Sequence, residues 1–131
     1  MFIRFITSFK NSSGERETGF FQAVGYLRRT SSIESVDLDE LHALLDWFCD
    51  HLPPPDQFTK RRNNKETGTA LSWYRDTAKE YIAKMYALST ILEKYGILSS
   101  VVKREDPGYI VYEDEIQVAA IPYREDRERV V

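Results

Sequence analysis

The alternation of apolar and polar residues at the start of the chain predicts a strand. Every second position carries a side chain that suits a buried face: Ile3, Phe5, Thr7 and Phe9. Arg4 and Lys10 fall on or near the other face. The loop-forming residues 11–17 then end this strand.

Apolar residues at helical spacing predict two helices next. The first can be capped by Thr18 and ends near Arg29. In the second, Asp37 can act as the N-cap with Glu40 completing a capping box, and an apolar stripe continues to Leu52. The prolines at 53–55 stop this helix, because proline cannot continue the hydrogen-bond ladder.

The second half of the chain predicts a strand at 70–74, the longest helix at 77–95 and strands at 97–104, 109–113 and 116–121. The long helix has a continuous apolar stripe, formed by Ala78, Ile82, Met85, Leu88, Leu92 and Tyr95. The order at 70–104 favours a parallel crossover, and the last strands favour a meander. We therefore predict an α+β fold, with a mixed sheet of about five strands and about three helices packed mainly on one face.

Two charged segments fall outside these elements. Residues 53–69 are polar and rich in turn formers, and they predict a long basic loop. Residues 124–131 include charges of alternating sign and predict a solvated C-terminal tail. Because each side of the loop is too small to hold a core by itself, we expect residues 1–131 to form a single domain.

Composition limits the class of protein. The 131 residues include 18 Lys and Arg against 21 Asp and Glu, for a net charge of −3, and 42% are hydrophobic. Such a chain can bury a real core, which excludes wholesale disorder. Its single cysteine excludes an internal disulfide framework. No run is apolar enough for a membrane span and the start is a poor signal peptide, so we expect a cytoplasmic protein.

Several motifs are similar to those of a known group of proteins. They are Phe2-Ile3-Arg4-Phe5, Thr18-Gly19-Phe20-Phe21-Gln22-Ala23, Ser72-Trp73-Tyr74-Arg75, Leu92-Glu93-Lys94-Tyr95-Gly96-Ile97 and the stretch 107–118. Together they cover most of the chain, which resembles a group of small bacterial hypothetical proteins of about this length. The group more often has Phe-Lys where this chain has Tyr74-Arg75. The resemblance implies a bacterial, cytosolic, single-domain protein and assigns no activity or functional residue.

Residues that bind metals or act as nucleophiles are few and poorly placed. His42 and His51 lie nine residues apart on one predicted helix, so their rings face different sides and cannot share a metal ion. Cys49 on the same helix cannot meet either ring, and we expect a buried or half-buried thiol. Phosphate-binding glycine motifs and serine nucleophile elbows are absent from the sequence. We therefore expect no catalytic residue, no metal site and no cofactor.

The basic loop is the first candidate for binding a partner. Four positive charges fall within six residues: Lys60, Arg61, Arg62 and Lys65. Arg75 follows the aromatic pair at 73–74, and cations beside aromatic rings are typical of single-stranded nucleic acid binding. The acidic chain, with a pI of about 5.4, and the expected burial of Trp73 disfavour that function. An acidic protein partner and a merely solvated loop are the alternatives.

Two further candidates lie on the last predicted strands. Four tyrosines, Tyr109, Tyr112, Tyr123 and Tyr74, suggest a protein interface, where tyrosine is enriched, or simply the wet rim of a small sheet. The acidic turn 113–115, together with Arg75, suggests a small-ligand or enzyme site, because crowded carboxylates raise one another's pKa. The simpler interpretation of that turn is a solvated hairpin tip that keeps a sheet edge from pairing.

The preferred hypothesis is a small, non-enzymatic binding protein that acts through a macromolecular partner, most simply another protein. The alternatives are a nucleic-acid accessory protein that uses residues 60–65, and a small-ligand binder or enzyme built on the acidic hairpin. A homo-oligomer is compatible with the sequence, and a membrane partner is not expected.

Overall fold

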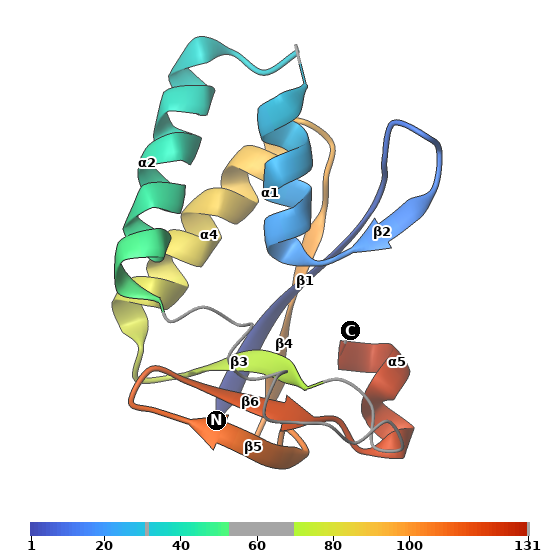
Figure 1. The fold of residues 1–131 in the computed structure, drawn as a ribbon, viewed down its shortest axis with the longest axis vertical. Helices are drawn as coiled ribbons and strands as arrows, with labels where there is room; N and C mark the ends of the chain where they lie inside the picture. Colours follow the sequence, from blue (N-terminus) through green and yellow to red (C-terminus); the bar gives the residue numbers. More distant parts are fainter. Residues whose placement is uncertain (31, 53–69, 131) are drawn as a thin grey trace. The chain divides into compact units, whose positions relative to one another are not determined.

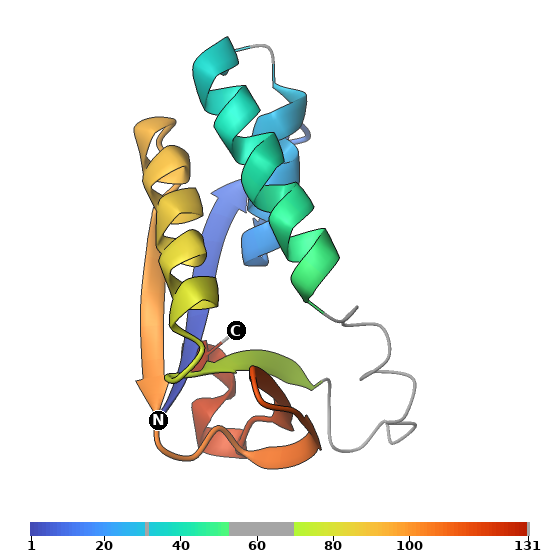
Figure 2. The same ribbon diagram turned by 90° about the vertical axis from the view of Figure 1, so that its left-hand side faces the viewer.

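The computed structural model describes residues 1–30, 32–52 and 70–130, which form an α+β structure (Figures 1 and 2). The predicted class is thus confirmed. The chain divides into two compact units. Unit 1 contains the described residues within 1–4, 53–82 and 101–131, and unit 2 contains those within 5–52 and 83–100. The expectation of a single domain stays a prediction.

Antiparallel strands form the frame of unit 1. The start of β1 (Phe2–Lys10) pairs with β3 (Leu71–Arg75). The strand β3 pairs with β6 (Gln117–Ile121), and β6 pairs with β5 (Tyr109–Glu113), so that β5 ends this path (Figure 1). The strand β4 (Ser99–Arg104) pairs with β1. The strands β3 and β4, which the predicted crossover at 70–104 joins, each pair with β1 and not with each other. The sheet is mostly antiparallel.

The core of unit 1 is built around a tryptophan. Trp73 is 1% exposed and packs with Val118, Ala120 and Val130. Its burial confirms that the indole ring belongs to the core and is not a stacking surface. The other face of β3 buries Tyr74, so the expectation that Tyr74 belongs to an exposed tyrosine surface is wrong. This burial raises the pKa of the Tyr74 phenol.

Most of the described residues at 124–130 are exposed, as expected of a solvated tail, but they are regular in structure and end on a buried residue. They form the 3-10 turn η1 (Arg124–Asp126) and the short helix α5 (Arg127–Val130), and Val130 is 1% exposed. Arg4 holds this segment: its Nε donates to the Val130 carbonyl at 2.6 Å and its Nη1 to the Ser72 carbonyl at 2.9 Å. Burial lowers the pKa of the Arg4 guanidinium to about 10, which still leaves it charged at neutral pH.

Unit 2 combines helices with a two-stranded hairpin. It contains the end of β1, β2 (Arg16–Thr18), α1 (Phe20–Arg29), α2 (Ser35–His51) and most of α4 (Lys79–Lys94). The helices α1 and α2 lie side by side in both views (Figures 1 and 2). The predicted apolar faces are buried at Phe5, Phe9, Phe20, Ala23, Val24, Leu27, Met85, Leu88 and Leu92. Aromatic rings meet edge to face within this core, as between Phe5 and Phe20 at 5.7 Å.

Three local predictions in unit 2 are wrong. Residues 16–18 form a strand where a loop up to residue 17 and a helix cap at Thr18 were expected. Asn11 Oδ1 accepts hydrogen bonds from the Ser13 and Glu15 amides and folds the chain back on β1. The helix α2 begins at Ser35, so Asp37 lies inside its first turn and is not its cap. Cys49 is exposed, because the buried stripe of α2 passes through the neighbouring Phe48.

None of the helices found in the three described ranges is long and apolar enough to cross a membrane.

Candidate functional site

The structure describes three of the predicted binding residues, Arg75, Tyr109 and Tyr112, and all three belong to unit 1. The other four, Lys60, Arg61, Arg62 and Lys65, lie outside the described residues.

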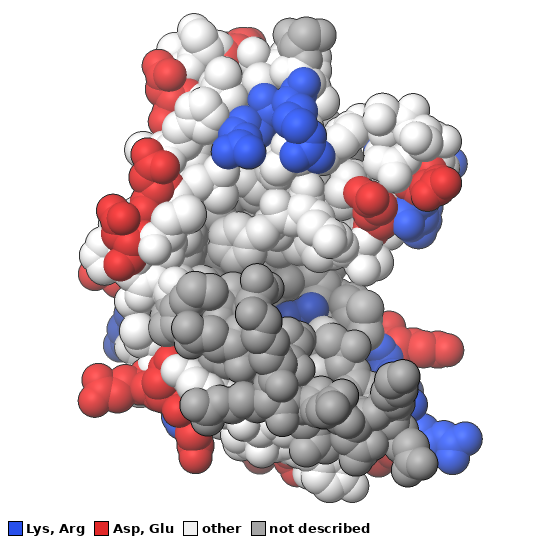
Figure 3. Space-filling model, in the orientation of Figure 1, with Lys and Arg blue, Asp and Glu red and all other residues white. Residues whose placement is uncertain are grey.

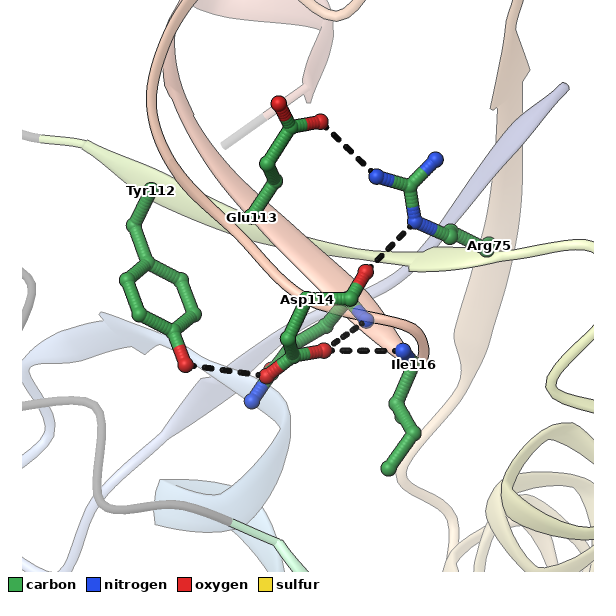
Figure 4. Close-up of polar contacts among 6 residues, drawn as sticks. Arg75, Tyr112, Glu113, Asp114 and Ile116 are labelled. Atoms are coloured by element: carbon green, nitrogen blue, oxygen red, sulfur yellow. Dashed lines mark hydrogen bonds and ion pairs between the residues drawn. The ribbon is translucent and has the colours of Figure 1, made fainter.

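The turn between β5 and β6 is held by a network of polar contacts (Figure 4). Asp114 Oδ1 accepts hydrogen bonds from the Ile116 and Gln117 amides, both at 2.8 Å. Its Oδ2 accepts a hydrogen bond from the Tyr112 hydroxyl at 3.0 Å. An aspartate that caps a turn in this way satisfies backbone donors that the ladder leaves open. The Asp114 carboxylate therefore has a structural role.

Arg75 ties the end of β3 to the same turn. Its Nε donates to the Asp114 carbonyl at 2.7 Å, and its Nη2 pairs with Glu113 Oε2 at 2.8 Å (Figure 4). The Arg75 side chain is about one-third exposed and the Glu113 side chain is 62% exposed, so solvent screens this pair. Arg75 and Glu113, on which the small-ligand hypothesis depends, thus meet, whereas Trp73 lies in the core. The contacts of this cluster stabilise the hairpin.

Tyr109 lies at the start of the last strand in the path, β5. It is 61% exposed, and its neighbour Ile110 is 45% exposed. The Tyr109 ring packs edge-on against Tyr123 at 4.9 Å, and the Tyr123 hydroxyl donates to Asp106 Oδ2 at 2.8 Å. That hydrogen bond raises the pKa of the Tyr123 phenol. The position of Tyr109 is therefore supported by a neighbouring ring, although much of its surface faces solvent.

The turn before β5 needs a glycine. Gly108 has a φ of 120°, and a Cβ at this position would lie 2.1 Å from the Ile121 carbonyl oxygen. The Gly108 amide donates to Asp106 Oδ1 at 3.0 Å. This turn places the start of β5 directly against β6 and leaves the other edge of β5 without a paired strand among the described residues.

Carboxylates bracket the β5 edge. Glu105 and Asp106 precede the strand, and Glu113 and Glu115 end or follow it. A bulge between Ile110 and Tyr112 interrupts the register with β6. The described edge thus presents two exposed apolar side chains between two acidic ends. The sequence indicated Tyr109 as a candidate binding residue because of its residue type. Ile110 became a candidate only when the structure placed β5 at the end of the strand path.

A second polar cluster, in unit 2, was missed by sequence reasoning. Asp37 Oδ2 accepts hydrogen bonds from Lys94 Nζ at 2.8 Å and from the Tyr95 hydroxyl at 2.6 Å. The Tyr95 oxygen in turn accepts the Glu34 amide at 2.9 Å. Lys94 and Tyr95 hold the pKa of Asp37 below its ordinary value, and Asp37 raises the pKa of Lys94. The cluster joins the start of α2 to the end of α4, 58 residues apart.

Within the described residues, no group of three or more His, Cys, Asp or Glu side chains is arranged to hold a metal ion. His51 stacks on Trp47 at 4.3 Å, and its Nδ1 lies 2.7 Å from the Trp47 carbonyl.

No family model, curated protein or solved structure matches the chain. A functional interpretation therefore depends on the geometry of its own residues.

Proposed function

We propose that this chain is a binding protein that takes an extended segment of a protein partner along the outer edge of β5. The observation that supports the proposal is the exposure of Tyr109 and Ile110, at 61% and 45%, on a strand that ends the path of described strands. An unpaired strand edge offers backbone donors and acceptors in a row. A partner strand can use them, while the exposed side chains supply apolar contact.

The charges around β5 favour a partner with lysine or arginine beside its apolar residues. Glu105 and Asp106 lie at one end of the strand, and Glu115 lies at the other, beside Glu113, whose charge Arg75 partly offsets. A cationic partner segment would be attracted to both ends. A second copy of β5 in an antiparallel arrangement would place acidic ends opposite each other, and like charges placed opposite are unfavourable. The edge is therefore better suited to a different chain than to itself.

The size of the edge predicts weak and reversible binding. The five residues of β5 extend about 17 Å, and the bulge at 110–112 shortens the regular part. An added strand of this length buries less than the roughly 1,200 Å² that stable complexes need. We expect a dissociation constant of about 1 μM or weaker.

A library of short random peptides displayed on phage tests the proposal. The purified protein is expected to enrich peptides in which alternating apolar residues are flanked by Lys or Arg. Resynthesised peptides should shift the amide NMR signals of β5, and their binding should weaken as salt screens the carboxylates.

Two variants make this test specific. Ile110→Lys places a cation on the edge and is expected to abolish peptide binding. Leu98→Lys, at a residue of unit 2 that is 72% exposed, makes the same kind of change elsewhere and should leave binding unchanged. The proposal fails if no peptide is enriched, if the enriched peptides lack cationic residues, or if Ile110→Lys binds them as well as the unmodified protein.

A further inference from the structure

We infer that a hollow in unit 2 binds a small organic anion, which carries a phosphate or carboxylate group on an apolar body. The hollow has a volume of about 430 Å³. Three parts of unit 2 line it: the β1–β2 hairpin, the end of α1, and the turn that follows α4. Volumes of this order are typical of sites for small organic ligands.

Two positive charges face each other in the hairpin that lines the hollow. Lys10 and Arg16 are directly opposite partners in the antiparallel pairing of β1 and β2, so both side chains project from the same face. Neither forms an ion pair with a carboxylate in the described part of the chain. Because like charges placed opposite destabilise a hairpin, this arrangement is poorly explained by folding alone. A bound anion would neutralise it.

Hydrogen-bond donors accompany these charges. Arg16 Nη1 donates to the Ser8 hydroxyl oxygen at 2.6 Å, which orients the guanidinium and leaves the hydroxyl proton of Ser8 free to donate. A guanidinium, an ammonium and a hydroxyl are the groups that recognise phosphate and carboxylate oxygens. Arg28 and Arg29 add positive charge in the last turn of α1, and Figure 3 shows basic side chains gathered over the end of this helix.

The C-terminal ends of two helices disfavour an anion in the hollow, but more weakly than Lys10 and Arg16 favour it. Thr30, after α1, and Gly96, after α4, both line the hollow. A helix C-terminus carries about half a negative charge. Part of each helix end is already in use, since Leu27 O accepts the Thr30 amide and Leu92 O accepts the Ile97 amide. Two full positive charges outweigh these partial ones.

The rest of the lining suits an apolar body. Tyr26, Leu27 and Ile97 contribute to it. A second hollow, of about 550 Å³, shares Tyr26 and Thr30 with the first and adds Arg29, but it also contains Glu17. The acidic group of the ligand therefore belongs beside Lys10 and Arg16, and the apolar body extends toward Tyr26.

Phenyl phosphate is a suitable probe, because it combines a dianion with a small aromatic body. In NMR titrations of the full chain, it is expected to give saturable shifts at the amides of residues 8–10, 16 and 30. Inorganic phosphate should bind at least threefold more weakly, because it lacks the ring, and phenol should give no saturable shift. Binding should weaken with added salt.

The decisive variant is Arg16→Gln, with Lys103→Gln, an exposed cation on β4, as its control. Arg16→Gln is expected to lower the affinity for phenyl phosphate at least tenfold, while Lys103→Gln leaves it unchanged. Without ligand, Arg16→Gln should melt at the same temperature as the unmodified protein or higher, because a repulsion is removed. A merely structural role for Arg16 would lower the melting temperature.

Three results would overturn the inference. They are the absence of saturable binding below about 10 mM phenyl phosphate, equal binding of phenol, and undiminished binding to Arg16→Gln. Because this hollow and the β5 edge lie in different units, failure here leaves the peptide experiment unaffected.

Discussion

Truncating Leu92 tests whether α4 supplies the core of unit 2. Leu92 is 0% exposed, and Leu92→Ala removes three carbon atoms from that core. At about 0.8 kcal/mol for each buried methylene, the lost transfer free energy is about 2.4 kcal/mol. The cavity that remains adds to this figure, so we expect a loss of about 2–5 kcal/mol. A domain of this size has about 5–15 kcal/mol of stability in total.

Leu98→Ala is the matched control, because it removes the same atoms from a residue that is 72% exposed. Only about a quarter of the transfer term applies there, so the expected loss is at most about 0.7 kcal/mol. The two variants therefore differ in burial and not in chemistry.

Urea unfolding followed by far-UV circular dichroism measures both losses. The midpoint should fall for Leu92→Ala without a change in slope, which would show that the native state itself is less stable. If Leu92→Ala does not fold, Leu92→Met, with an expected loss below about 1.5 kcal/mol, keeps the comparison available. The placement of the core would be refuted if Leu92→Ala were as stable as the unmodified protein while Leu98→Ala lost several kcal/mol.

Four further predictions follow from other contacts. Lys94 and Tyr95 lower the pKa of Asp37, so the Asp37 carboxylate stabilises the fold fully above its ordinary pKa. This stabilisation is lost as the pH falls through the lowered pKa. Asp37→Asn should therefore flatten the acid side of a curve of unfolding free energy against pH. Arg4→Gln should lower the unfolding free energy by about 1–3 kcal/mol and speed hydrogen exchange in α5. The reason is that the variant loses the hydrogen bond to the Val130 carbonyl or the one to the Ser72 carbonyl. Asp114→Ala should cost about 1–3 kcal/mol in urea unfolding, while Asp114→Asn should recover most of that loss. The sequence predicts a solvated loop at 60–62, and on that expectation neutralising these residues together should change the unfolding free energy in urea by only about a few tenths of a kcal/mol.

Local periodicity determined much of the fold before any contact was known. The two-residue period of β1 and the helical periods of α1 and α4 identified side chains that the structure buries. Such patterns can be read from the sequence because strand and helix geometry repeats over a few residues. The sheet strand over Tyr109–Glu113 was predicted with the same bounds that the structure gives it. The α+β class followed from the order of these elements.

The polar contacts were decided by tertiary structure. Arg4 meets Val130 across 126 positions, and Asp37 meets Tyr95 across 58. No local period encodes such pairs, so the helix α5 and the burial of Val130 were not predicted within the charged tail, and a cap was predicted where a buried carboxylate lies. The same holds for both candidate sites. Tyr109 and Ile110 became an exposed edge only through the order of the strands, and Lys10 faces Arg16 only because β2 forms. Which side chains meet depends on how distant elements pack. That packing is driven by the burial of apolar surface from the whole chain and not by any local pattern.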